Sequence, residues 1–143
     1  MSGETDKDHE GRKGPKRRKS AHKGTRTRAR IAAVEVLYRL DLLEDENPTT
    51  VIMEVITRRQ LAGTAADYLN ELAKKTLKQQ MHIDAMIERS LTDWRLVRLS
   101  YVDRAILRLA ACEMLYFAQI PPKVSIDEAV ELARFYGTEG SAR

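Results

Sequence analysis

The sequence predicts an all-α protein. Apolar residues recur at three-to-four-residue spacing in successive stretches from about residue 28 onward, which is the periodicity of amphipathic helices. No stretch alternates apolar and polar residues as a half-buried strand does, and no Asn-Gly or Asp-Gly hairpin turn occurs. The 143 residues suffice for one domain or for two small helical subdomains that share an interface. We expect a helical domain over residues 28–143, with subdomains of about 28–80 and 81–143.

The first two helices are separated by Asn47-Pro48. The first is expected to begin near Thr27 or Arg28 and to end before this pair, because proline and asparagine favour a turn. Thr49 or Thr50 is then expected to cap the second helix. The apolar positions that define the two helices are Ala33, Val34, Leu37, Leu40 and Leu43 in the first and Val51, Ile52, Val55 and Ile56 in the second.

Gly63-Thr64 marks the start of a third helix, which runs to about Leu77. Three lysines lie on its expected solvent side: Lys74, Lys75 and Lys78. A fourth, short helix is expected from His82 to Ser90. The segment from Leu91 to Leu99, which contains Trp94, has weak periodicity and is expected to connect helices.

Ser100 is expected to cap a fifth helix, with Asp103 in its first turn near the positive helix end. This helix is apolar around most of its circumference, and we expect only a narrow stripe with Arg104 and Arg108 to face solvent. Pro121-Pro122 ends it. The four residues from Ser125 to Glu128 have the pattern of a capping box, which predicts the start of a sixth helix there.

Charge is distributed very unevenly along the chain. The twenty residues from Gly11 to Arg30 carry ten positive charges and no negative one, whereas residues 31–143 carry a net charge of −3. Residues 1–27 have almost no apolar side chains, so burial cannot offset the entropy of ordering them, and we expect a disordered basic arm. A basic arm on an acidic body is typical of proteins that bind nucleic acid, although a merely solubilising tail has the same composition.

The sequence contains no recognisable catalytic or metal site. The one cysteine, Cys112, lies among apolar residues and is expected to be a packed thiol, and a chain with one cysteine fits the reducing cytoplasm. Asp103 and Glu113 lie ten residues apart on one helix, about 15 Å along its axis, which is too far for joint acid–base catalysis. We therefore expect no enzymatic activity, no metal and no cofactor. No apolar stretch is long enough to span a membrane, and no signal peptide is evident.

The basic arm is the strongest candidate binding site. Arginine makes bidentate contacts with phosphate and stacks on unpaired bases, which suits single-stranded RNA. Backbone N–H groups at the start of the first helix also favour phosphate. The expected RNA-binding residues are Lys16, Arg17, Arg18, Lys19, Lys23, Arg26, Arg28 and Arg30.

The chain contains three segments, Arg28–Tyr38, Val102–Met114 and Val124–Gly137, which together and in this order resemble the bacterial transcription antitermination factor NusB family. Residues Arg28–Tyr38 resemble the opening helix of that family, and Val102–Ala110, followed by Glu113-Met114, resembles its buried central helix. Residues Val124–Ala133 with Tyr136-Gly137 resemble the helix that follows. The resemblance implies two packed three-helix bundles, and a further helix after the stretch that ends this sequence.

The resemblance also implies a function and partners. Members of the family bind boxA RNA as a heterodimer with NusE, a small-subunit ribosomal protein, and help to load an antitermination complex on RNA polymerase. By position, the arginine-rich start of the first helix is the implied RNA contact, and Tyr38 and Asp103 match positions at the protein-partner face. Whether the free protein is a monomer or a homodimer stays open.

Two other interpretations stay open at this point. NusB-like bundles also occur as RNA-binding domains of ribosomal-RNA cytosine methyltransferases, so the chain could be a fragment of such an enzyme. A DNA-binding protein with a basic tail would have the same charge distribution, and it would bind duplex DNA and RNA with equal affinity.

Overall fold

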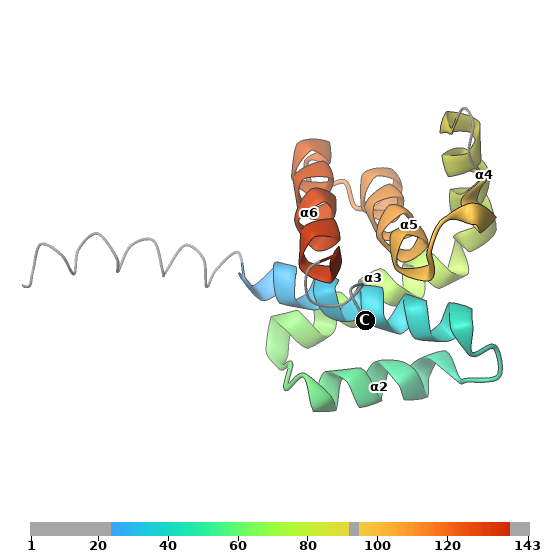
Figure 1. The fold of residues 1–143 in the computed structure, drawn as a ribbon. Helices are drawn as coiled ribbons and strands as arrows, with labels where there is room; N and C mark the ends of the chain where they lie inside the picture. Colours follow the sequence, from blue (N-terminus) through green and yellow to red (C-terminus); the bar gives the residue numbers. More distant parts are fainter. Residues whose placement is uncertain (1–23, 92–94, 138–143) are drawn as a thin grey trace, which may run out of the picture.

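A computed structural model describes residues 24–91 and 95–137, and every regular element in those ranges is helical (Figure 1). This confirms the all-α fold. An N-terminal helix is described over residues 24–42, so Thr25, Arg26 and Thr27, which the sequence placed in the arm, are already helical. The remaining elements are α2 (Pro48–Arg58), α3 (Gly63–Lys78), α4 (Gln80–Ser90), the short 3₁₀ helix η1 (Leu96–Arg98), α5 (Tyr101–Tyr116) and α6 (Pro122–Phe135).

The helices form two groups that share one core. The N-terminal helix, α2 and α3 lie together at the bottom of Figure 1, and α4, α5 and α6 stand above them. Helix α5 packs against α3, α4 and α6, so it is the central element that the sequence pattern indicated. Buried apolar residues from both groups form a single continuous cluster. None of the helices described is long and apolar enough to cross a membrane.

Three helix starts test the predicted caps. The Ser100 hydroxyl accepts a hydrogen bond from the backbone N–H of Asp103 at 3.0 Å, which confirms that Ser100 caps α5. The prediction for α2 was wrong, because Asn47 is the cap: its side-chain oxygen accepts from the backbone N–H of Thr50 at 3.0 Å, and Pro48 is the first helical residue. Proline fits this position since its missing N–H would have no helical partner there.

The predicted capping box of the sixth helix was also wrong. Helix α6 begins at Pro122, three residues before Ser125, and Ser125 is buried. The Ser125 hydroxyl does not cap a helix end; it donates a hydrogen bond to the Glu113 carboxylate of α5 at 2.7 Å. A Ser-x-x-Glu pattern therefore serves tertiary contacts here, because an upstream proline already starts the helix.

The solvent-exposed stripe expected on α5 is buried. Arg108 holds Asp84 of α4 through two hydrogen bonds of 2.8 and 2.9 Å, and Arg104 pairs with Asp41 of the N-terminal helix at 2.9 Å. Both arginines are at most 9% exposed. Their long stems cover apolar surface while the guanidinium groups bind carboxylates, which a count of polar residues cannot reveal. By contrast, Met114 is 43% exposed, although it lies on this largely apolar helix.

Replacing Arg108 tests this account of α5. Arg108→Gln leaves the Asp84 carboxylate without its guanidinium partner and removes one of the two arginines that contact Asp41. We expect a loss of about 3 kcal/mol in the free energy of unfolding. The exposed Arg89 of α4 is the control, because Arg89→Gln should change stability by less than about 0.5 kcal/mol. Urea denaturation of both variants measures the difference. Equal stabilities would contradict an internal role for Arg108.

Candidate nucleic-acid interface

A buried carboxylate joins four helices beneath the start of the N-terminal helix. Glu113 of α5 is 2% exposed, and its two oxygens accept hydrogen bonds from three side chains. Arg30 of the N-terminal helix donates through Nε at 2.7 Å, the Tyr68 hydroxyl of α3 donates at 2.5 Å, and the Ser125 hydroxyl of α6 donates at 2.7 Å. A buried charge is stable only when paired and hydrogen-bonded, so these contacts fix the four helices relative to one another.

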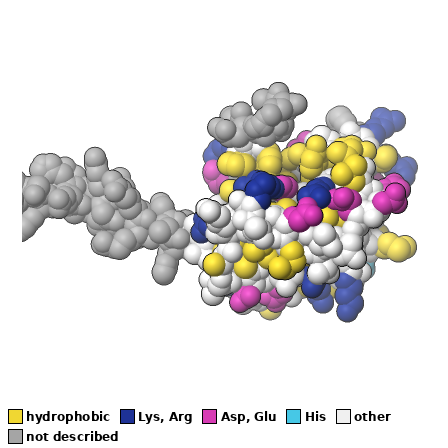
Figure 2. Space-filling model, turned by 90° about the horizontal axis from the view of Figure 1, so that it is seen from below, with side chains coloured by type: hydrophobic (Ala, Val, Ile, Leu, Met, Phe, Trp, Pro, Cys, Tyr) yellow, Lys and Arg dark blue, Asp and Glu magenta, His cyan; other side chains and the backbone are white. Residues whose placement is uncertain are grey.

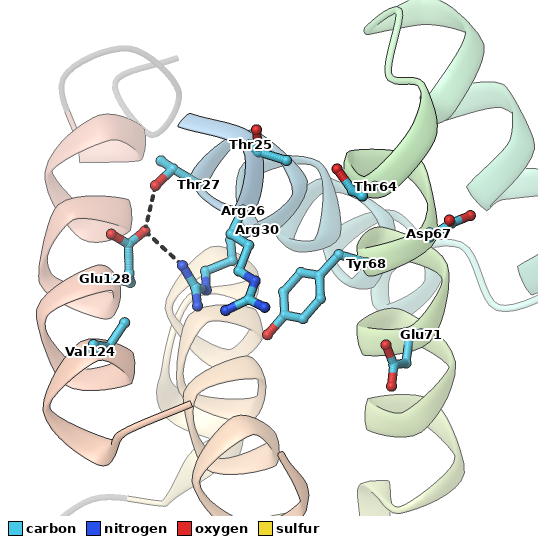
Figure 3. Close-up of a pocket in the computed structure, with 10 residues that line it drawn as sticks. All are labelled: Thr25, Arg26, Thr27, Arg30, Thr64, Asp67, Tyr68, Glu71, Val124 and Glu128. Carbon is cyan, nitrogen blue, oxygen red and sulfur yellow. Dashed lines mark hydrogen bonds and ion pairs between the residues drawn. The ribbon is translucent and has the colours of Figure 1, made fainter. Parts of the chain in front are cut away.

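Glu128 of α6 extends this cluster to the edge of the molecule. Its Oε1 accepts a hydrogen bond from the Thr27 hydroxyl at 2.9 Å and pairs with Nη1 of Arg30 at 3.2 Å (Figure 3). Burial by itself lowers the pKa of Arg30, but the hydrogen bond and negative charge of Glu113 outweigh that effect and raise it. The guanidinium group therefore stays charged, and it is occupied by two internal carboxylates.

The pKa of Tyr68 is raised, first by burial and then by its hydrogen bond to Glu113. The phenol consequently remains protonated and keeps donating to the carboxylate. Two guanidinium groups lie near its ring, with Arg26 at 5.2 Å and Arg30 at 5.7 Å from the ring centroid. These distances allow cation–π attraction, which holds the exposed Arg26 side chain beside α3.

Arg26, Arg30 and Tyr68 line a recess of about 660 Å³ between the N-terminal helix, α3 and α6 (Figure 3). The α3 side of this recess is acidic, with Asp67 and Glu71 among its lining residues. The recess therefore offers the positive charge of Arg26 along the N-terminal helix, since Arg30 is already paired, and negative charge along α3 and at Glu128 of α6. A polyanion would contact the first side and avoid the second.

The structure separates the three arginines that the sequence grouped together. Arg26 and Arg30 lie four residues apart on one face of the helix, whereas Arg28 lies about 200° from Arg26 around the axis and is exposed. Arg26 is exposed as well, but Arg30 is only 4% exposed and faces Glu113. Arg26 and Arg28 are thus free to meet a ligand, and Arg30 holds the helix in place. The other expected RNA-binding residues lie outside the described residues: Lys16, Arg17, Arg18, Lys19 and Lys23.

The two expected partner residues lie at the other end of the N-terminal helix. Tyr38 is 37% exposed and contacts Tyr101 of α5 edge to face, with ring centroids 6.3 Å apart. The guanidinium group of Arg104 lies 4.7 Å from the Tyr101 ring, and Asp103 is exposed in the first turn of the same helix. Two tyrosine rings and a free carboxylate therefore gather where the N-terminal helix meets α5.

Charge is mixed on the face below these helices. Lys and Arg side chains lie next to Asp and Glu side chains in Figure 2 and do not form one field of positive charge. Ion pairs between the N-terminal helix and residues 46–59, which contain α2, include Arg39 with Glu46 and Glu54, and Glu35 with Arg58 and Arg59. Since these charges neutralise each other locally, this face gives no strong attraction for a polyanion.

Neither Cys112 nor His82 forms part of a reactive site among the described residues. Cys112 is buried, and burial raises the pKa of its thiol, as expected for a packed side chain. His82 is exposed on α4. Among residues 24–91 and 95–137, no cluster of three potential metal ligands occurs. The residues that the site analysis missed are Glu113 and Tyr68; a glutamate inside the apolar run of α5 was the available signal, because carboxylates are rarely fully buried without a partner.

Substituting Glu113 tests whether its carboxylate holds the helices together. Glu113→Gln preserves the shape of the side chain but removes the nearer of the two counter-charges of buried Arg30, and we expect a loss of about 3 kcal/mol in unfolding free energy. Ser125→Ala removes one neutral donor to the same carboxylate and should cost about 1 kcal/mol. Denaturant unfolding ranks the two variants. A Glu113→Gln protein no less stable than Ser125→Ala would rule out the electrostatic role.

Comparison with known proteins places these features in a family. A model described as the NusB family matches residues 27–143. The transcription antitermination protein NusB of Bacillus licheniformis is 39% identical over 119 residues, covering 82% of this chain and 88% of that protein. The corresponding protein of Bacillus mycoides is 36% identical over 118 residues, with the same shares covered.

Solved structures agree with the sequence matches. The NusB structure of T. maritima superposes with a TM-score of 0.73 at 36% identity and covers 81% of each chain. A chain from a crystal structure of antitermination factors NusB and NusE in complex with dsRNA superposes with a TM-score of 0.71 at 32% identity, covering 78% of this chain and 83% of that one. With the family model matched from the N-terminal helix to residue 143, and relatives this similar over most of their length, the chain belongs to the NusB family.

Proposed function

We propose that this protein is an RNA-binding transcription antitermination factor. It binds boxA-type RNA together with NusE and helps to assemble an antitermination complex on RNA polymerase during ribosomal RNA transcription. It acts by binding its partners and carries out no bond chemistry of its own. The name of its relatives supports antitermination, and the related structure of NusB and NusE with dsRNA supports the two binding partners.

One observation carries the RNA-binding part of the proposal. Of the ten positive charges of residues 11–30, seven precede the N-terminal helix and three lie in its first turns, where Arg26 and Arg28 are exposed. The arm and the start of the helix together form a continuous cationic segment in the sequence. Such a segment binds RNA because its cations displace the counterions condensed on the RNA phosphates. The proposed phosphate contacts are Lys16, Arg17, Arg18, Lys19, Lys23, Arg26 and Arg28. Arg30 acts indirectly, because its pairing with Glu113 sets the orientation of the helix that carries the others.

The partner part of the proposal uses the far end of the same helix. Tyr38 and Tyr101 offer aromatic surface, and Asp103 offers a negative charge. Tyrosine is among the residues that dominate binding energy at protein interfaces, and an exposed carboxylate orients a basic partner. A ribosomal protein is such a partner, because proteins that bind ribosomal RNA are commonly basic.

The salt dependence of RNA binding tests the first part. If six cations each meet a phosphate of single-stranded RNA, the plot of log K against log salt should have a slope near −4. The double variant Arg26→Gln/Arg28→Gln should be shallower by about 1.4 units of slope. The double variant Arg89→Gln/Arg98→Gln makes the same change in net charge at exposed positions of α4 and η1, and should match the unmodified protein.

A slope near zero for the unmodified protein would reject the proposed RNA contact. Competition with duplex DNA belongs in the same titration. Equal affinity for duplex DNA and single-stranded RNA would favour a general nucleic-acid-binding protein over an antitermination factor.

Binding of NusE tests the second part. Tyr38→Ala should weaken NusE binding about 30-fold, the effect of losing one aromatic hot spot of about 2 kcal/mol. Asp103→Asn should act mainly on the association rate and its salt dependence. Calorimetry and stopped-flow association measure the two effects, with Asp127→Asn on the exposed face of α6 as control. RNA binding should also rise cooperatively when NusE is added; a purely additive response would contradict a joint complex.

A further inference from the structure

A second recess lies beside the first, between α3 and the end of α5. It has a volume of about 550 Å³, and its lining includes Lys74, Lys75 and Lys78 of α3 together with Tyr116 and Phe117. Three lysines within five residues on one side of a helix make this the most concentrated positive charge on α3. The proposed function described above does not use it.

Two of these lysines form no ion pair within the described residues, although Asp67 and Glu71 line the same recess. Lys74 and Lys78 are exposed, and neither forms an ion pair with any residue in the described part of the chain. They also lie four residues apart on α3, where like charges destabilise a helix by a few tenths of a kcal/mol. The fold thus gains nothing from this pair, and an external anion would relieve its repulsion.

The third lysine is held in place by an aromatic ring. The Lys75 ammonium lies 5.1 Å from the centroid of the Tyr116 ring. The Tyr116 hydroxyl donates a hydrogen bond to Gln79 at 3.3 Å, and the His82 ring lies against the same tyrosine with a centroid distance of 6.4 Å. This support restricts the lysine side chain, so less conformational entropy is lost when a ligand binds it.

We propose that Lys74, Lys75 and Lys78 bind the phosphates of an RNA segment that continues past the site at the N-terminal helix. The inference rests on the proposed RNA-binding function and extends it to a second, sequence-independent contact. The two recesses are adjacent, because Asp67 and Glu71 line both of them. From Tyr68 in the first recess, Lys75 lies about 10 Å and Lys78 about 15 Å farther along α3.

The junction between the recesses shapes how the strand would run. Asp67 and Glu71 repel phosphate, so direct contacts are expected at the two basic ends and not between them. A flexible single strand can satisfy both ends by spanning the acidic junction. A rigid duplex has less freedom to do so, which is why single-stranded RNA is the occupant we infer.

The test compares RNA lengths on the full chain. Two probes are used: a single-stranded boxA-type RNA, and the same RNA with unstructured extensions at both ends. For the extended probe, Lys74→Gln/Lys78→Gln should make the log K against log salt plot shallower by about 1.4. Because the variant loses the counterion release of two phosphate contacts, it should bind the extended probe about 25-fold more weakly than the unmodified protein at 0.1 M salt. The short probe should bind the variant as it binds the unmodified protein.

The charge-matched control is Arg89→Gln/Arg98→Gln, which should leave both probes unaffected. If the lysine variant binds the extended probe as tightly as this control does, the inference is overturned while the proposed function stands. An equal loss on both probes would also overturn it, since the lysines would then belong to the first site. If the unmodified protein binds neither probe, the proposed function falls and this inference falls with it.

Discussion

The arrangement of helices around Glu113 is the constraint on which the rest of the structure depends. A carboxylate placed inside the apolar face of α5 would be costly alone, since a buried charge needs a paired charge and hydrogen bonds. The N-terminal helix supplies Arg30, α3 supplies Tyr68 and α6 supplies Ser125, each at hydrogen-bonding distance. Because these donors come from different helices, the carboxylate is satisfied in only one relative placement of all four elements.

This constraint divides the arginines of the protein into two kinds. Arg30, Arg104 and Arg108 point inward and are held by carboxylates of other helices. Arg26 and Arg28 remain exposed on the N-terminal helix. The inward group fixes the orientation of the helix, and that orientation determines which side chains of the outward group a polyanion can reach. Structural and binding roles are therefore interleaved along residues 26–30. Arg28 points away from Arg30, and Arg26 shares the face of Arg30 but lies one turn nearer the helix start, where it is exposed.

The N-terminal helix also separates the two proposed binding surfaces. Arg26 and Tyr38 lie twelve residues apart, which corresponds to about 18 Å along the axis. RNA at one end and a protein partner at the other could be bound together without overlap. A rigid helix tied to α5 by Arg30–Glu113 near one end and by Asp41–Arg104 near the other would hold the two ligands at a fixed separation. That arrangement suits a factor that assembles other molecules.

The sequence by itself determined the all-helical class, the central position of α5, the Ser100 cap and the uneven distribution of charge. These features follow from local periodicity, capping chemistry and counting, which need no knowledge of neighbours in space. Only the tertiary structure decided that Arg104 and Arg108 are internal, that Ser125 serves Glu113 and not a helix end, and that Arg30 is buried against Glu113. Each of these depends on a carboxylate or donor far away in the sequence. Whether a polar side chain is buried depends on the partner that satisfies it, and the fold supplies that partner.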